Sequence, residues 1–452
     1  MKINKLKVKW FGGVLALAIA IWTLSGVALG EVNWRKYAGT KIRVVSWGWP
    51  YSELAVEEMI PEFEKKTGIK VNWETYGAWQ MREKVNLNLV SKSSDIDAFW
   101  YQMNQLQLWL YKGDHIVDIT EFIKNPDLTP SDWDWEDFPA SIRHALESAP
   151  GNYGLPFRVH GNLLLYRTDL LKKAGISVPQ NFEELEAAAA KLKQDGVAGW
   201  VARGTGSEAV WALPAWLFAY GGAFFDKDHK PALTKPESLR AIELYGKMLR
   251  EYGPPEPLGI GWMELNSIFQ SGKAAMCEAG DAAPFSDPER SQIVGKYDVT
   301  SMPAGPAGRA SVLTVTMLAI SKYSNKKEAT WLFIQWLNNK ENILKFLQNG
   351  TPVCRVSAWE DPRFKSKLSP NWVEASRAGQ KNALYAAKPW VLSVEEVRDL
   401  IGTIIEAAIK GEDIKPVAQE VSEKIVKVMQ RTGSIDLPIP MERVYMPENV
   451  WR

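Results

Sequence analysis

The fold is indicated most clearly by residues 41–76, which read KIRVVSWGWPYSELAVEEMIPEFEKKTGIKVNWETY. The run at 41–46 has the apolar, β-branched composition of a short buried strand. A helix is expected over 53–66, because Gly68 supplies a stop signal directly after it, and Pro61 should kink it. The segment therefore begins as a strand followed by a helix.

Two more strands are expected nearby, at 69–76 and at 96–101. Strands that alternate with helices predict a mostly parallel sheet with both faces covered, which makes the fold class α/β. The alternation restarts with a strand over 163–166. Three later helices are expected to begin at a capping box, formed by Asn181 with Glu184, by Thr234 with Glu237 and by Ser393 with Glu396. A strand is expected over 313–320, a helix over 326–337 and a last helix that ends near Arg431.

Length and charge narrow the class of protein. A chain of 452 residues exceeds what one hydrophobic core usually serves, so two lobes are expected. The formal net charge of +1 makes nucleic acid an unexpected partner. Trp is normally the rarest aromatic residue, yet the chain has 21 Trp against 15 Phe and 14 Tyr. This excess of Trp needs an explanation.

The N-terminus reads as a targeting segment. Four lysines between Lys2 and Lys9 precede an apolar run over 11–29, and Ala28 and Gly30 are the small residues that a signal peptidase reads. We expect a signal peptide at 1–30 and a periplasmic or extracellular mature protein. The alternative is an uncleaved membrane anchor, because the run nearly reaches the roughly 20 residues that span a bilayer.

The two cysteines, Cys277 and Cys354, allow either a disulfide or two buried free thiols. Two cysteines and four scattered histidines do not give the ligand spacing of a metal site. We therefore expect no metal and no cofactor.

Five segments spread over most of the mature chain share a recognisable pattern. They are IPEFEKKTGIKV at 60–71, YGLP at 153–156 with LYRTDLLKKAG at 165–175, SIFQSGKAAM at 267–276, KKEATWLFIQWL at 326–337 and GTPVCR at 350–355. Together they resemble the extracellular solute-binding proteins of ABC importers, in the carbohydrate-binding cluster related to maltose-binding protein. The stretch at 278–288 is more similar to the polyol-binding branch, whereas Arg167 and Cys354 depart from the family pattern.

This resemblance implies a two-lobed periplasmic-binding-protein-like fold with hinge crossings and a ligand cleft between the lobes. The expected crossings lie near Pro156, Arg309 and Pro352. The implied partners are a small carbohydrate or polyol and the permease subunits of the transporter, and the protein is expected to be a monomer. The implied lobes are 31–153 plus 313–350 for the N-terminal lobe and 154–312 plus 351–452 for the C-terminal lobe.

Aromatic residues follow the ends of the first three expected strands. Ligands of open α/β sheets bind beyond the carboxyl ends of the strands. A rigid aromatic plane also suits the apolar C–H face of a sugar ring or an extended polyol. The alternative for each residue is packing in the core. The candidate ligand-binding residues of this lobe are Trp47, Trp49, Tyr51, Trp79, Trp100 and Tyr101.

The second lobe and the crossings add aromatic, acidic and basic candidates. A carboxylate accepts two hydrogen bonds from adjacent hydroxyl groups, and arginine donates to ligand oxygens. The alternatives are core packing for the tryptophans, a solvated or hinge-paired role for the acids, and an interlobe salt bridge for the arginines. The candidates are Trp211, Trp216, Trp262, Glu278, Asp281, Arg158 and Arg355.

No catalytic residue is expected, because the chain contains no Gly-x-Ser-x-Gly, His-Glu-x-x-His or Gly-rich phosphate-loop motif. Two alternatives stay open. One is a receptor of the same fold for an anion, a metal or a peptide. The other is a secreted glycoside hydrolase, since its carboxylate pair is defined in space and not by spacing. A strongly positive cleft would favour an anion, and a neutral aromatic cleft a carbohydrate.

Overall fold

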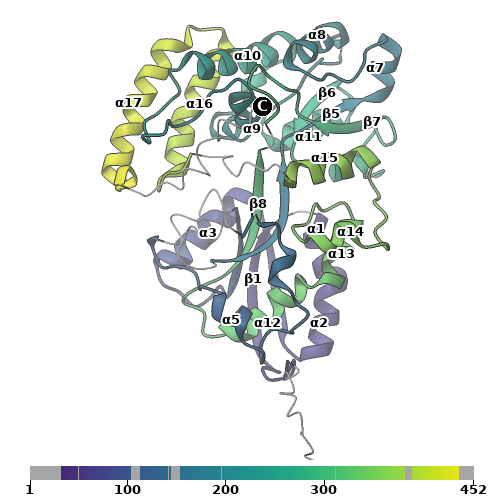
Figure 1. Ribbon diagram of the computed structural model, residues 1–452, viewed down its shortest axis with the longest axis vertical. Helices are drawn as coiled ribbons and strands as arrows, with labels where there is room; N and C mark the ends of the chain where they lie inside the picture. The colour runs from purple at the N-terminus through teal and green to yellow at the C-terminus, as the bar shows by residue number, and fades with distance from the viewer. Residues whose placement is uncertain are drawn as a thin grey trace, which may run out of the picture.

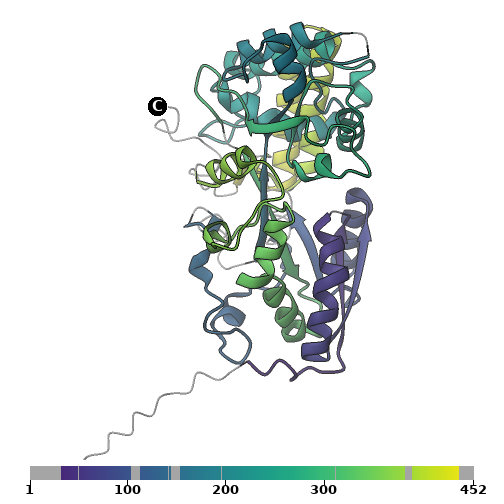
Figure 2. The ribbon, with the colours of Figure 1, turned by 90° about the vertical axis from the view of Figure 1, so that its right-hand side faces the viewer.

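The computed structural model places two lobes one above the other along its longest axis (Figures 1 and 2). The lower lobe of Figure 1 holds the N-terminal strands, and the upper lobe holds the long C-terminal helices. The structure describes residues 32–48, 50–102, 112–140, 142–143, 153–194, 196–310, 312–381 and 389–436, without the side chains of 50, 51, 78 and 79.

A five-stranded sheet forms the centre of the lower lobe, in the order β2-β1-β3-β8-β4. β1 pairs in parallel with β2 and β3, as predicted, whereas β8 is antiparallel to both of its neighbours. β8 matches the strand expected over 313–320. The strands are β1 (Lys41–Trp47), β2 (Lys70–Tyr76), β3 (Ala98–Gln102), β4 (Leu155–Gly161) and β8 (Leu313–Ile320).

The direction of β4 fixes which edge of this sheet faces the upper lobe. β3 and β4 are both antiparallel to β8, so β4 runs in the same direction as β1, β2 and β3. β4 leads directly into β5 (Leu163–Arg167), which belongs to the sheet of the upper lobe. The carboxyl ends of β1, β2 and β3 therefore point toward the upper lobe.

Helices cover both faces of the lower sheet (Figure 1). The helix expected over 53–66 is divided into α1 (Pro50–Leu54), a π-helical turn at Ala55–Met59 and α2 (Ile60–Thr67). Pro61 lies in the first turn of α2, where its missing N–H costs nothing, so the irregular turn precedes it. The other helices are α3 (Ala78–Val90), α5 (Thr120–Lys124), α12 (Lys327–Leu337), α13 (Lys340–Gln348) and α14 (Val356–Glu360).

The upper lobe is built on a three-stranded antiparallel sheet in the order β6-β5-β7. Its other strands are β6 (Met276–Ala279) and β7 (Tyr297–Ser301). Its helices are α7 (Thr168–Ala174), α8 (Phe182–Leu192), α9 (Gly206–Ala219), α10 (Pro236–Tyr252), α11 (Trp262–Gln270), α15 (Pro370–Lys381), α16 (Val394–Lys410) and α17 (Ile414–Thr432).

The expected helix caps are only partly present. Asn181 caps α8, because its side chain accepts a 2.8 Å hydrogen bond from the backbone N of Glu184. The cap predicted at Thr234 is wrong: Lys235 is the N-cap of α10, without a side-chain bond, and Pro236 begins the helix with its fixed φ. Ser393 stands at the N-cap of α16 but makes no capping hydrogen bond.

Two apolar cores hold the fold together. One runs from the five-stranded sheet into the base of the upper lobe, and the other fills the upper lobe between its long helices. Many of the tryptophans belong to these cores. α14 packs with the lower lobe, since the backbone N of Ser357 donates to Asp137 at 2.8 Å.

Candidate functional site

The N-termini of three helices of the upper lobe meet at one place. The backbone N of Trp262, the first residue of α11, donates a 2.7 Å hydrogen bond to the carboxylate of Glu208 in α9. Arg398 of α16 donates to the backbone carbonyl of Ser207, also in α9. Helix N-termini favour negative charge, and Glu208 supplies it here.

An ion pair joins this helix cluster to the lower lobe. Arg82 of α3 lies 3.1 Å from one carboxylate oxygen of Glu395 in the first turn of α16. The other oxygen of Glu395 accepts from Arg398 at 2.7 Å. α3 begins just beyond the carboxyl end of β2, so the Arg82–Glu395 pair lies where the sheet edge faces the upper lobe. Burial lowers the pKa of Arg82, and the charge of Glu395 opposes that shift.

A second ion pair joins the lobes at the crossing strand β4. Arg158 donates to both carboxylate oxygens of Asp281, at 2.7 and 2.8 Å, and both side chains are buried. This is the interlobe salt bridge that was the alternative to ligand contact in the sequence analysis.

Arg355 lies in the lower lobe. Its guanidinium donates to Asp137 at 3.0 Å and to the backbone carbonyl of Asn338 at 2.7 Å, and it lies over the ring of Trp133. The side chain is fully buried. Both the acid and the carbonyl that hold Arg355 belong to the lower lobe, so this arginine makes no bridge across the cleft.

Glu278 is buried inside the upper lobe, at the end of β6. One of its oxygens accepts from the indole N of Trp216 at 2.7 Å, and the other accepts from the side-chain amide of Asn162. Burial raises the pKa of Glu278 to about 8. Trp216 packs between Phe182 and Tyr245 in the core, which is the alternative given for it above.

Trp211 is covered by two basic side chains. The guanidinium of Arg203 lies 4.3 Å from its ring centroid, and the ring of His160 stacks near it at 6.0 Å and 15°. Gly280 allows this close arrangement, because a Cβ there would come within 2.9 Å of the indole. Burial lowers the pKa of Arg203 to about 10.

The candidates at the ends of β1 and β3 differ in exposure. Trp100 and Tyr101 are 1% and 0% exposed, because β3 is the central strand of a sheet with both faces covered. Trp100 packs against Phe157 at 4.6 Å between ring centroids. Trp47, at the end of β1, is half-buried. Trp49 and the side chains of Tyr51 and Trp79 lie outside the described residues.

Among the candidate aromatics whose side chains are described, Trp47 and Trp262 are the two that keep partial exposure. Trp47 ends a strand that points toward the upper lobe, and Trp262 belongs to the helix cluster described above. The polar residues that form the ion pair at the lobe boundary, bond the N-terminus of α11 or lie over Trp211 were not predicted from the sequence. These are Arg82, His160, Arg203, Glu208, Glu395 and Arg398, which no local motif marks.

Cys277 and Cys354 are buried free thiols, and burial raises the pKa of each. Within the described ranges, no three His, Cys, Asp or Glu side chains gather in a way that could hold a metal ion. The helices in that part of the chain also include none long and apolar enough to cross a membrane.

Residues 49–343 match the family model of the bacterial extracellular solute-binding proteins. The chain belongs to this family. Among curated relatives, it is 24% identical over 384 residues to an erythritol/L-threitol-binding protein of Mycolicibacterium smegmatis, covering 77% of this chain and 79% of the relative. It is 26% identical to a mannitol-binding protein of Pseudomonas aeruginosa, covering 61% of this chain and 64% of that relative.

Solved structures of solute-binding proteins share the fold. The structure resembles an ABC transporter solute-binding protein of Agrobacterium radiobacter in complex with ribitol, with a TM-score of 0.78, 25% identity, and coverage of 86% of this chain and 99% of that one. A solute-binding protein of Agrobacterium vitis with bound D-mannitol has a TM-score of 0.76 at 21% identity, over 87% of this chain and 99% of the other. The two-lobed α/β fold predicted for this solute-binding protein is therefore confirmed.

Proposed function

We propose that this protein captures a neutral sugar or polyol between its lobes and delivers it to the permease of an ABC importer. The observation that carries the proposal is that a half-buried tryptophan stands on each lobe: Trp262, beside Glu208 in the helix cluster, and Trp47, at the end of a strand that points toward the upper lobe. The names of the relatives and the ligand of the ribitol complex support a polyol in particular.

The balance of charge favours a neutral ligand over an anion. Three arginines at the lobe boundary face carboxylates: Arg82 and Arg398 share Glu395, and Arg158 is paired with Asp281. The N-terminus of α11, which could hold an anion, already donates to Glu264 from the backbone N of Gly261 and to Glu208 from that of Trp262. A ligand carboxylate or phosphate would find these donors occupied.

Binding would combine stacking with charge-assisted hydrogen bonds. The C–H face of a polyol packs on the rings of Trp47 and Trp262, and its hydroxyls exchange hydrogen bonds with charged groups at the lobe boundary. Each lobe supplies one of these rings, so the full set of contacts forms only when the lobes are closed. The ligand therefore shifts the population toward the closed state.

The remaining parts of the proposal concern location and partners. A protein of this family works outside the cytoplasm, so the segment at 1–30 would act as an export signal. The closed complex would dock as a monomer on the permease subunits. No chemistry on the ligand is proposed. Of the acids described at the lobe boundary, Glu208 accepts a helix N–H and Glu395 is paired with arginines, which suits binding better than proton transfer.

Thermal unfolding of the purified protein tests this proposal, because a ligand that binds only the folded state raises the unfolding midpoint. The panel contains erythritol, ribitol, D-mannitol, monosaccharides and oligosaccharides, with phosphate, zinc and amino acids as controls. A rise with one neutral sugar or polyol alone is expected. A rise with phosphate, zinc or an amino acid alone would contradict it and support the alternative receptor of the same fold.

A further inference from the structure

We propose that the Arg82–Glu395 pair limits the length of the ligand, so that the cleft accepts a single sugar or a short polyol and discriminates against oligosaccharides. This inference rests on the proposed function and adds the size of the ligand. It starts from the observation that the two lobes are joined by ion pairs at two separate places, Arg82–Glu395 and Arg158–Asp281.

The upper-lobe side of the first pair is held rigidly. Glu395 lies in the first turn of α16, and Arg398, one turn later, donates to the same carboxylate at 2.7 Å. Arg398 is only 5% exposed and is itself fixed to the backbone carbonyl of Ser207 in α9. The carboxylate that meets Arg82 therefore keeps its position without help from the lower lobe.

The lower-lobe side belongs to the sheet edge that faces the upper lobe. Arg82 lies in α3, which begins directly beyond the carboxyl end of β2. Arg82 and Glu395 are 24% and 30% exposed, so the pair lies at a rim and not inside a core. A pair at a rim can open and close with the lobes, which a core pair cannot do without loss of packing.

The two pairs border the space between the lobes on different sides. Arg158 stands on β4, in the crossing strands at the centre of Figure 1, whereas α3 and α16 lie to their left. The Arg82–Glu395 pair is also close enough to Glu208, beside Trp262, for that carboxylate to act on the pKa of Arg82. A ligand stacked on Trp262 therefore lies next to the bridge, and a longer one that extends past it must separate Arg82 from Glu395.

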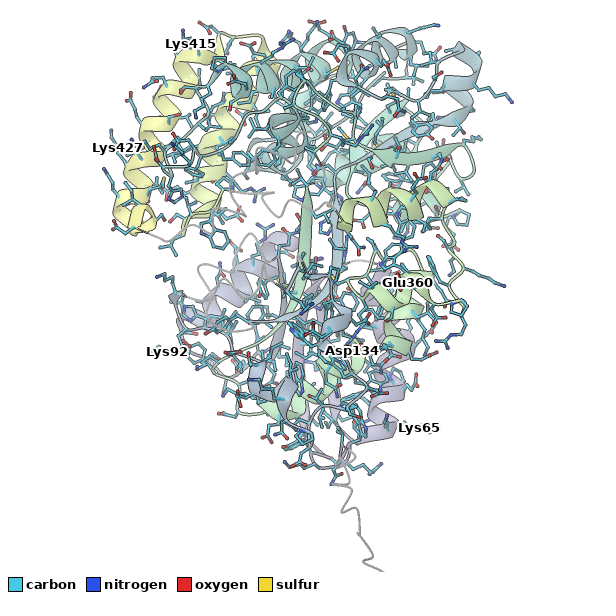
Figure 3. All side chains as sticks on the ribbon, in the orientation of Figure 1. Lys65, Lys92, Asp134, Glu360, Lys415 and Lys427 are labelled. Carbon is cyan, nitrogen blue, oxygen red and sulfur yellow. The ribbon has the colours of Figure 1, made fainter. Side chains whose placement is uncertain are left out.

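The experiment is calorimetric titration of the wild-type protein and its variants with ribitol, D-mannitol and maltotriose. The test variants are Glu395→Gln, which keeps the side-chain size and removes one charge, and Arg82→Gln, which shortens the side chain and removes the other charge. The matched control is Lys424→Gln, which breaks an exposed ion pair with Glu420 within α17. Figure 3 shows Lys415 and Lys427 of the same helix on the outer side of the upper lobe. The unfolding midpoint of each variant confirms that it folds.

We expect the wild-type protein to bind a polyol and to bind maltotriose at least about tenfold more weakly. Each test variant should narrow the ratio of the two dissociation constants by about three- to fivefold, the size expected for one partly exposed pair. The double variant should narrow it little further, because the two residues act as one unit. Lys424→Gln should leave the ratio unchanged.

Two results would overturn the inference while leaving the proposed function in place. One is wild-type protein that binds maltotriose as tightly as it binds a polyol. The other is a ratio that stays the same in both Arg82→Gln and Glu395→Gln, although both are folded. Wild-type protein that binds no carbohydrate or polyol at all would instead refute the proposed function, and the inference with it.

Discussion

Arg158 of β4 and Asp281, just beyond β6, form a buried ion pair that connects the two lobes where the chain crosses between them. Asp281 belongs to the upper lobe, and Arg158 belongs to the strand that crosses between the lobes. Because both side chains are almost fully buried, the charge of each is neutralised by the other.

Asp281→Asn should therefore destabilise the protein by about 3 kcal/mol, because it leaves the guanidinium of Arg158 buried without a counter-charge. Urea unfolding measures this loss, with Lys424→Gln as a control that should stay within about 0.5 kcal/mol of wild type. A loss below about 1 kcal/mol for Asp281→Asn would show that the pair is not buried as described.

Trp262→Ala and Trp47→Ala should each weaken binding of the polyol by about 1–3 kcal/mol, by analogy with the stacking of bases on aromatic side chains. Both side chains are half-buried, so the folded state should tolerate the changes. Trp100→Ala should behave differently, losing about 3–5 kcal/mol of stability because its ring lies in the core. Titration calorimetry and urea unfolding separate the two effects. If the affinity for the polyol is unchanged in both Trp262→Ala and Trp47→Ala, these two tryptophans are not part of the binding site.

The stability of the protein should fall as the pH rises from about 5 to about 8. Burial raises the pKa of Glu278 to about 8 in the folded state, from its ordinary value of 4.5. Between these values the folded state holds a proton that the unfolded state has lost, so deprotonation favours unfolding.

The difference in unfolding free energy between pH 5.5 and pH 8.5 measures this effect. Wild type should lose up to about 3 kcal/mol more than Glu278→Gln, which cannot titrate. Equal losses in the two proteins would mean that Glu278 is ionised in the folded state throughout this range.

Both cysteines should be free and unreactive in the folded protein. Cys277 and Cys354 are buried, and the raised pKa of each keeps the thiolate, the reactive form, scarce. Ellman's reagent should detect no thiol in the native protein and both thiols after denaturation without reductant. Absence of thiols after denaturation would indicate that the exported protein forms the disulfide after all.

Patterns along the chain predicted the elements of the fold well where the signal is local. The apolar run of β8 and the cap of α8 at Asn181 were both read from adjacent residues. The cap at Thr234 failed because Pro236 starts α10 one residue later than the capping-box spacing implied. β8 could not be recognised as antiparallel, since strand direction depends on which lobe the chain has come from.

The candidate site was harder to predict, because its residues meet only in the folded protein. Arg82 and Glu395 are 313 positions apart, and neither belongs to a motif. Trp100 and Trp47 both belong to strands with apolar runs, yet one is buried and the other half-buried. Their difference comes from their place along the strand, because Trp47 is the last residue of β1 whereas Trp100 lies in the middle of β3, and sequence spacing does not reveal these bounds.

Direct titration tests most simply whether the ligand is a neutral sugar or polyol. Purified protein is titrated in a calorimeter with erythritol, ribitol and D-mannitol, and in parallel with phosphate and glutamate. We predict saturable binding of one ligand molecule per chain for at least one polyol and none for the anions. Saturable binding of an anion, with no heat from any polyol or sugar, would contradict the proposed function.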